Sequence, residues 1–257
     1  MLRGRKIRGV LLDLSGVLYI DNQPVPGAIE ALGRLRDAGL SVRFLTNTTR
    51  TPQSRILDKL ESMGFTIKPG EIFTAPLAAK KYIQSENLSP FLLVHRDLMP
   101  EFTDIPAGGK ESVLVGDAAD DFTYANLNHA FRLLQAGAIL LAMGTNRYFR
   151  TGDTFSMDAG PFVRALEYAA GCKALILGKP AAEFYNHAIE TMQCTPEETV
   201  MVGDDAEADV LGAQLCNING ILVRTGKYRS EDEALISGKA VSVDDVGSAV
   251  DVILNPA

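Results

Sequence analysis

The chain has 257 residues, of which 46% are hydrophobic and 22% charged, and its formal net charge is −7. These values are typical of an ordinary globular protein with one large or two medium domains. The negative charge argues against nucleic acid or an anionic membrane as the main partner. No apolar window approaches the roughly 18–20 residues of a membrane span. Three cysteines without a CxxC pair favour neither a disulfide framework nor a zinc site.

The N-terminal segment, Met1–Lys6, is basic and leads into a short apolar run that Asp13 interrupts. A secretory signal peptide has a longer uninterrupted apolar core. Isolated cysteines are also typical of a reducing compartment. The sequence therefore predicts a cytoplasmic protein.

Short apolar runs alternate with helical patterns along the chain, which indicates an α/β fold with a parallel sheet. In the first part of the chain we expect a strand over 9–12, a helix over 26–38, a strand over 41–45 and a helix over 51–64. Prolines and glycines then punctuate a stretch with strands expected over 91–95, 112–115 and 138–143 and a helix over 124–135. We interpret residues 76–171 as a smaller α/β domain inserted into a core domain formed by residues 1–75 and 172–257.

The last part of the chain resumes the pattern of the core domain. We expect its sheet to continue with a strand over 174–177, a helix over 181–192, a strand over 199–202, a helix over 207–215, a strand over 221–224 and a strand and helix within 241–254. The sequence thus predicts one parallel sheet, formed by both ends of the chain, that carries the main site.

Asp13 ends the first apolar strand abruptly and is followed by a small polar residue and a glycine. Open α/β sheets bind ligands at the carboxyl edge of their strands. A carboxylate there can accept a phosphoryl group as an acyl phosphate, which water then hydrolyses. Asp13 is therefore the candidate nucleophile; the alternative is an Asx-turn residue that ends a strand.

A carboxylate can approach a phosphoryl group only if a cation neutralises the repulsion between them. Mg²⁺ suits this task because it prefers oxygen ligands and needs only one or two protein carboxylates. Asp13 and Asp204 follow strands that we expect to be neighbours, and the backbone carbonyl of Ser15 can add a third oxygen. The sequence therefore predicts a Mg²⁺ site formed by Asp13, Ser15 and Asp204.

Thr46, Asn47 and Lys179 follow two other expected strands. The hydroxyl of Thr46 and nearby N–H groups can bind phosphate oxygens, and the Lys179 ammonium can hold both the phosphate and the nucleophile. The alternatives are an ordinary turn at Thr46-Asn47 and a solvated lysine in a loop. Asp205 and Asp209 are expected to support the site: one of the two neighbouring carboxylates Asp204 and Asp205 binds metal while the other orients Lys179 or a metal-bound water, and Asp209 complements a helix dipole.

Residues 114–117, Leu-Val-Gly-Asp, repeat the pattern of residues 201–204, Met-Val-Gly-Asp. Only one of these acids can belong to the catalytic pair. The second follows Lys179 and lies in the resumed core, so we choose Asp204. Asp117 is interpreted as a turn and helix-capping residue after a strand of the inserted domain.

Four pieces in this order resemble the haloacid dehalogenase superfamily of aspartate-nucleophile phosphotransferases: Asp13-Leu14-Ser15-Gly16, Thr46-Asn47, Lys179-Pro180, and Gly203-Asp204-Asp205 with Asp209. The large insertion resembles the C2-capped branch of that superfamily. The resemblance implies a Rossmann-like core with an inserted C2 cap, a Mg²⁺ site at Asp13, Ser15 and Asp204, phosphate contacts from Thr46, Asn47 and Lys179, and a small phosphorylated substrate. It also implies a homodimer formed through the cap.

One departure from the family pattern concerns Ser15. Most family phosphatases carry a general acid/base aspartate at this position, and such a proton transfer is worth roughly 10²–10⁴-fold in rate. We therefore expect activity toward leaving groups that need little protonation: aryl phosphates, phosphoanhydrides and phosphoramidates. Two alternatives remain open: a catalytically weak protein that binds phosphate or a partner, and a dehalogenase acting on a 2-halo acid without metal.

Residues 144–153 of the inserted domain mix cations and aromatic side chains. Arg147 or Arg150 is a candidate for reading a second anionic group of the substrate. The alternative is a solvated loop.

Overall fold

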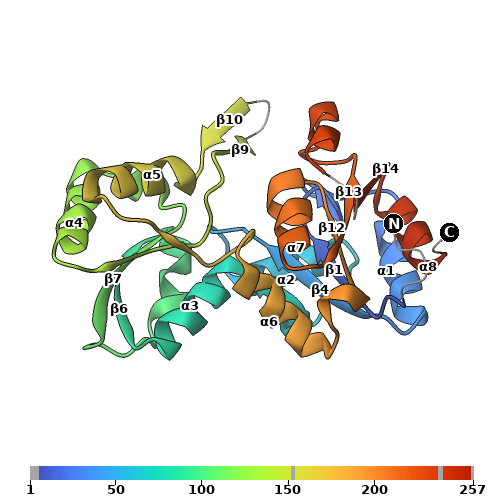
Figure 1. Ribbon diagram of the computed structural model, residues 1–257, viewed down its shortest axis with the longest axis horizontal. Helices are drawn as coiled ribbons and strands as arrows, with labels where there is room; N and C mark the ends of the chain where they lie inside the picture. Colours follow the sequence, from blue (N-terminus) through green and yellow to red (C-terminus); the bar gives the residue numbers. More distant parts are fainter. Residues whose placement is uncertain (1–5, 152–153, 237–239, 256–257) are drawn as a thin grey trace. The chain divides into compact units, whose positions relative to one another are not determined.

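The computed structural model describes residues 6–151, 154–236 and 240–255 (Figure 1). It divides the chain into two compact units. The core unit comprises Met1–Thr46, Gln53–Phe73 and Lys179–Ala257, and the inserted unit comprises Asn47–Pro52 and Thr74–Gly178. Most of the basic N-terminal segment used above for the cellular location, and residues 152–153 of the mixed stretch, lie outside the described residues.

The core unit is built on a six-stranded sheet in the order β14-β13-β12-β1-β4-β5. Its strands are β1 (Gly9–Asp13), β4 (Ser41–Thr46), β5 (Ile72–Thr74), β12 (Thr199–Gly203), β13 (Asn219–Val223) and β14 (Ala240–Val243). The strands from β14 to β4 pair in parallel, with β1 between β12 and β4. The expected core sheet from both ends of the chain is therefore confirmed. Because β1 is central, Asp13 lies in the middle of the carboxyl edge.

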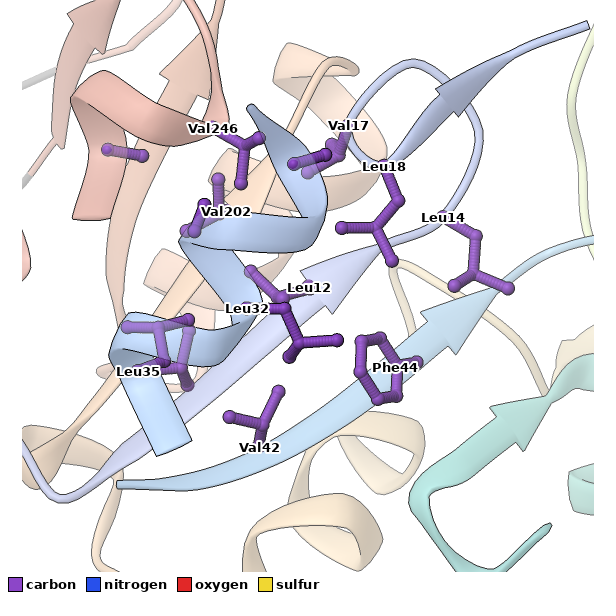
Figure 2. Packing of buried hydrophobic residues seen from close by; sticks show 14 of the residues in the cluster. Leu12, Leu14, Val17, Leu18, Leu32, Leu35, Val42, Phe44, Val202 and Val246 are labelled. Carbon is purple, nitrogen blue, oxygen red and sulfur yellow. The ribbon is translucent and has the colours of Figure 1, made fainter. Parts of the chain in front are cut away.

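Helices cover this sheet through apolar side chains spaced along one face. In α1 (Ala28–Asp37), the buried residues are Ala28, Ala31, Leu32 and Leu35, the spacing of an amphipathic helix. Figure 2 shows Leu32 and Leu35 packed toward Leu12 of β1 and neighbouring side chains of the sheet. Every residue of β1 is buried, as expected for a strand covered on both faces.

The remaining elements of the core unit are the helices α2 (Gln53–Ser62), α6 (Ala182–Met192), α7 (Gly212–Leu215) and α8 (Val246–Leu254), the short strands β2 (Tyr19–Ile20) and β3 (Gln23–Pro24), and the 3₁₀ turns η1 (Pro69–Glu71), η4 (Pro196–Glu198) and η6 (Ser230–Ala234). The single helix expected over 207–215 is wrong in type. The structure has a π-helix, η5 (Ala206–Leu211), followed by the one-turn helix α7.

The inserted unit has a second parallel sheet, in the order β11-β8-β7-β6. Its elements are α3 (Ala75–Ser85), β6 (Leu88–Leu93), η2 (Arg96–Phe102), β7 (Lys110–Val115), η3 (Ala119–Asp121), α4 (Tyr124–Gln135), β8 (Ile139–Ala142), β9 (Tyr148–Thr151), β10 (Thr154–Met157), α5 (Ala159–Ala170) and β11 (Leu175–Ile176). Buried apolar residues form two clusters, one including α3 and one including α4 and α5.

Three expectations about the inserted domain need correction. The strand expected over 174–177 to resume the core sheet is β11, which instead pairs with β8 in the inserted unit. Residues 172–178 therefore group with that unit. Residues 47–52 do so as well, since Thr49 and Arg50 are hydrogen-bonded to Asp117 after β7. Residues 148–151 and 154–157 form the antiparallel strand pair β9–β10 rather than a solvated loop.

Within the ranges described, no helix is long and apolar enough to cross a membrane.

Candidate active site

Three buried aspartates converge at the carboxyl edge of the core sheet. Asp13 is the last residue of β1, and Asp204 directly follows β12, the strand paired beside it. Asp209 reaches the same place from the π-helix η5. One carboxylate oxygen from each lies within 4.8 Å of the others, and the side chains are nearly inaccessible to solvent. Asp13 and Asp204 are far apart in the sequence, and they lie close together because the carboxyl ends of parallel strands meet at one edge of the sheet.

Lys179 is the cation of this cluster. Its side chain is 3% exposed, and its Nζ donates to Asp13 Oδ1, to Asp209 Oδ1 at 2.6 Å and to the Leu45 carbonyl at 3.3 Å. It therefore joins the ends of β1 and β4 to the π-helix. The alternative of a solvated loop lysine is excluded by this burial.

The carboxylates keep the Lys179 side chain charged. Burial alone lowers the pKa of a lysine, but Asp13 and Asp209 act in the opposite direction and raise the pKa of Lys179 above its ordinary value. The ammonium is thus a permanent positive charge beside the Asp13 carboxylate at neutral pH.

Asp209 contacts Lys179 directly, whereas the sequence predicts this role, or the orientation of a metal-bound water, for the member of the pair Asp204-Asp205 that does not bind metal. Its Oδ2 accepts from the Asp205 backbone N–H at 3.2 Å. A Cβ on Gly203 would lie 2.2 Å from that same oxygen, so the carboxylate occupies the space left by a missing side chain. Burial, opposed by Lys179 and assisted by Asp13, raises the pKa of Asp209 to about 7. Asp209 is therefore part of the buried charge cluster.

Asp205 turns away from its neighbour Asp204, as expected for adjacent residues. Its Oδ1 accepts from the Ala208 backbone N–H at 2.9 Å and so caps the π-helix. Its Oδ2 lies 3.5 Å from Lys227 Nζ. Asp205 thus supports the segment that carries Asp209.

Asp204 is enclosed by two glycines and a backbone amide. Its Oδ2 accepts from the Lys227 N–H at 2.7 Å. A Cβ on either Gly16 or Gly226, both at positive φ, would lie 2.0 Å from that oxygen. Thr225 Oγ1 donates to the Gly16 carbonyl and ties the two loops together. The orientation of the Asp204 carboxylate is therefore set by the loop that contains Thr225, Gly226 and Lys227.

Burial raises the pKa of Asp204 well above its ordinary value, and Asp13 and Asp209 add to the effect. When all three carboxyl groups are ionised, they and the single ammonium leave an excess of negative charge in a buried space, which is why burial and mutual repulsion raise these pKa values. A divalent cation with oxygen ligands fits such a donor set.

Ser15 and Thr46 lie at the same edge of the core sheet. Ser15 is exposed in the turn after β1, where it forms an isolated bridge with Tyr19. Thr46 is buried at the end of β4, one residue beyond the carbonyl that accepts from Lys179. Asn47 is assigned to the inserted unit, where a Cβ on Gly178 would lie 2.7 Å from its Oδ1.

Asp117 has the structural role that we inferred for it, with a partner that the sequence did not indicate. Its carboxylate accepts from Arg50 Nε and Nη2 at 2.5 and 3.2 Å and from the Ala119 N–H at 2.9 Å. Arg50 also lies 4.7 Å from the centre of the Phe149 ring. The segment 114–117, Leu-Val-Gly-Asp, therefore anchors residues 47–52 within the inserted unit. Arg147 is exposed at the base of the β9–β10 hairpin.

Comparisons with known proteins agree with this geometry. A family model described as haloacid dehalogenase-like hydrolase matches residues 10–105, and one described as HAD-hydrolase-like matches residues 176–249. Haloacid dehalogenase-like hydrolase domain-containing protein 2 of Bos taurus is 44% identical over 255 residues, 99% of this chain and 98% of that protein. Phospholysine phosphohistidine inorganic pyrophosphate phosphatase of Danio rerio is 42% identical over 257 residues, 97% of this chain and 95% of that protein.

Among solved structures, a 4-nitrophenylphosphatase from Thermotoga maritima superposes with a TM-score of 0.87 at 25% identity, covering 96% of this chain and 97% of that one. The likeness extends over both units and confirms the expected fold class, a parallel α/β core with an inserted α/β domain. The acidic cluster, the two family matches and the full-length relatives lead to one conclusion. The chain belongs to the haloacid dehalogenase-like hydrolase family and is an enzyme of that family.

Proposed function

We propose that the protein is a Mg²⁺-dependent phosphatase that acts on a small phosphorylated substrate through an aspartyl-phosphate on Asp13. The observation that carries this proposal is the buried contact of Asp13 with Lys179, beside Asp204 and Asp209. The names of the relatives support the reaction class, since several are phosphatases.

In the first step a carboxylate oxygen of Asp13 attacks the phosphorus atom. The bond from phosphorus to the leaving-group oxygen or nitrogen breaks, and the leaving group departs with that electron pair. Water then attacks the phosphorus of the acyl phosphate and releases inorganic phosphate and free Asp13. Lys179 holds the nucleophile in place and adds a positive charge near the transferred group.

The metal site would be formed by Asp13, Asp204 and the carbonyl of Ser15. The excess negative charge of the three aspartates supports a divalent cation there, and Mg²⁺ prefers oxygen ligands of this kind. When bound, Mg²⁺ supplies the charge that offsets repulsion between the carboxylates and the phosphoryl oxygens. Asp209 offers a further oxygen, but it already accepts from Lys179 and the Asp205 amide. We therefore assign Asp209 and Asp205 supporting roles.

Thr46, Asn47 and Lys179 are the proposed phosphate contacts. Thr46 is supported by its place at the end of β4, next to the carbonyl that accepts from Lys179. Asn47 directly follows Thr46 in the chain and is proposed on the resemblance of this pair to the family pattern.

The expected leaving groups follow from Ser15. A serine hydroxyl is too weak an acid to protonate an alkoxide at neutral pH. The substrate class proposed is therefore aryl phosphates, phosphoanhydrides and phosphoramidates. The zebrafish relative is named for phosphoramidates and a phosphoanhydride, namely phospholysine, phosphohistidine and pyrophosphate.

The test is release of phosphate from p-nitrophenyl phosphate and from pyrophosphate, with MgCl₂ or EDTA, by the wild type and Asp13→Asn. We expect release that needs Mg²⁺ and falls on the order of 10⁴-fold or more in the variant. No release from a folded wild type that binds Mg²⁺ would reject the proposal and favour a phosphate- or partner-binding protein. Release that persists in EDTA would reject the metal dependence alone.

The inserted unit is also proposed to form a homodimer. The β9–β10 hairpin exposes Phe155 and Met157 by 61% and 63%, and Tyr148 by 39%. Apolar side chains that cluster on a surface are typical of an interface. Sedimentation velocity of the wild type and a Phe155→Asp/Met157→Asp variant tests this: a dimer that becomes a monomer supports it, and a wild-type monomer rejects it.

A further inference from the structure

Tyr185 is a fully buried tyrosine whose hydroxyl lies beside the π-helix that carries Asp209. It belongs to α6, the helix that begins shortly after Lys179. Its Oη donates to the Ala208 carbonyl and lies 3.4 Å from the Asp209 carbonyl. One side chain therefore links the helix after Lys179 to the backbone on both sides of the Asp209 Cα.

The surroundings of this hydroxyl leave it little freedom. A Cβ on Gly212 would lie 2.8 Å from Tyr185 Oη and 2.7 Å from Pro180 Cβ. The hydroxyl therefore occupies a space that exists only because residue 212 is a glycine. Pro180 directly follows Lys179, so the same close packing includes the backbone next to the catalytic lysine.

The π-helix is the element for which such a link matters most. π-Helical turns are rare and are frequently found at functional sites. Here the turn directs Asp209 into the space beside Gly203, where it meets Lys179 at 2.6 Å. A hydrogen bond to the Ala208 carbonyl stabilises this turn at the residue before Asp209.

We propose that Tyr185 is a positioning residue: through its hydrogen bond to the Ala208 carbonyl it fixes Asp209 against Lys179, and Lys179 in turn holds Asp13. The catalytic consequence rests on the proposed phosphatase function. The structural part, that the hydroxyl holds the π-helix in place, does not depend on it. The proposed role of Tyr185 is indirect: it requires no contact with Asp13 or with the substrate, and it acts only through the position of Asp209.

The test compares Tyr185→Phe, which removes only the hydroxyl, with Ile189→Val. Ile189 lies one turn further along α6 and is 4% exposed, so its variant makes a small change in the same helix and leaves the Tyr185 hydroxyl in place. For Tyr185→Phe we expect amide hydrogen exchange of the 204–212 segment to rise roughly fivefold or more. We expect kcat for p-nitrophenyl phosphate to fall roughly tenfold, with a KM within about threefold of wild type, because small displacements of catalytic groups reduce the rate more than the binding. Ile189→Val should show neither effect.

Two outcomes overturn the inference. One is an exchange rate in the 204–212 segment of Tyr185→Phe that equals the wild-type rate. The other is a loss of kcat that Ile189→Val shows to the same extent, which would indicate general loosening of α6. If the wild type releases no phosphate, the proposed function fails, and the exchange measurement still decides whether Tyr185 positions Asp209.

Discussion

Lys179 and Asp209 form a buried ion pair with 2.6 Å between Nζ and Oδ1, and their side chains are 3% and 1% exposed. The same ammonium also binds Asp13. A single cation therefore has two carboxylate partners in a buried space. Because breaking such a pair leaves an uncompensated buried charge, the ion pair links the stability of the core unit to its chemistry.

Lys179→Met tests this link. Loss of the ammonium leaves Asp13 and Asp209 without their shared cation, so we expect the free energy of unfolding to fall by about 3–5 kcal/mol. Phosphatase activity should fall on the order of 10²–10³-fold or more. Urea unfolding at neutral pH and phosphate release measure the two quantities.

The double variant Lys179→Met/Asp209→Asn is the control for charge. It removes one of the two stranded carboxylates, so part of the lost stability should return, whereas activity should not. A double variant no more stable than Lys179→Met would contradict the ion-pair account.

The pKa of Asp209 predicts how stability changes with pH in the absence of metal. The folded protein holds this pKa at about 7, against 3.8 for an ordinary aspartate. The folded state therefore binds more protons than the unfolded state between these values. The contribution of Asp209 to the free energy of unfolding is fully present below about pH 4 and is lost as the pH rises through about 7. Asp204, whose pKa is also raised, acts in the same direction.

Bound Mg²⁺ should oppose this loss, because the cation competes with protons for the oxygens of Asp204 and its charge favours the ionised form of the neighbouring Asp209. We expect MgCl₂ to raise the Tm more at about pH 8 than at about pH 5, relative to EDTA. Thermal scans across this range measure the effect. Asp209→Asn, which has no carboxyl group to titrate, should show a flatter dependence in EDTA; an unchanged slope would assign the effect to other groups.

The sequence predicted the edge of the core sheet well because local signals suffice there. Asp13 and Asp204 each follow a continuous apolar strand, and both lie where those strands end. The helix over 124–135 was predicted to the residue, since Thr123 caps its start and Gly137 follows its end. Such signals need no knowledge of distant contacts.

Other features depend on contacts that no local pattern reports. The apolar run at Leu175–Ile176 is compatible with either parallel sheet, and only its pairing with β8 assigns it to the inserted unit. The pattern over 207–215 fits an ordinary helix, and the π-helical turn accompanies the Tyr185 and Asp205 hydrogen bonds to Ala208. The contact between Lys179 and Asp209 depends on that turn, so no local pattern indicates it, and the sequence assigns the orientation of Lys179 or of a metal-bound water to one of Asp204 and Asp205 instead.

Gly226→Ala tests whether the loop after β13 orients Asp204. A Cβ there would lie 2.0 Å from Asp204 Oδ2 and 2.5 Å from Gly16 Cα, so the carboxylate has to move. Loss of groups that orient a metal ligand typically reduces metal affinity by roughly 10–100-fold. We expect a decrease of that size in Mg²⁺ affinity by titration calorimetry.

Gly39→Ala is the matched control for this variant. Gly39 has a positive φ of 75°, close to the 64° of Gly226, but among the residues that the structure describes, apart from its two chain neighbours, none has an atom within 4 Å of its would-be Cβ. It carries the same backbone strain without the clash at Asp204. Equal Mg²⁺ affinity in the two alanine variants would show that the clash with Asp204 does not determine the affinity of the metal site.

Ser15→Asp tests the proposed selectivity for good leaving groups. The Ser15 side chain is exposed in the turn after β1, so a carboxylate can be accommodated there without burial of an unpaired charge. If only a general acid is missing, turnover of an alkyl phosphate such as glycerol phosphate should rise roughly 10–10²-fold, whereas p-nitrophenyl phosphate, whose leaving group needs no proton, should change little. In the Ser15→Asn variant the asparagine side chain has nearly the same shape as aspartate but cannot act as an acid, so turnover of neither substrate should rise. A wild type that hydrolyses both substrates equally fast, or an equal gain in the asparagine variant, would show that the residue at position 15 does not select the leaving group through proton transfer.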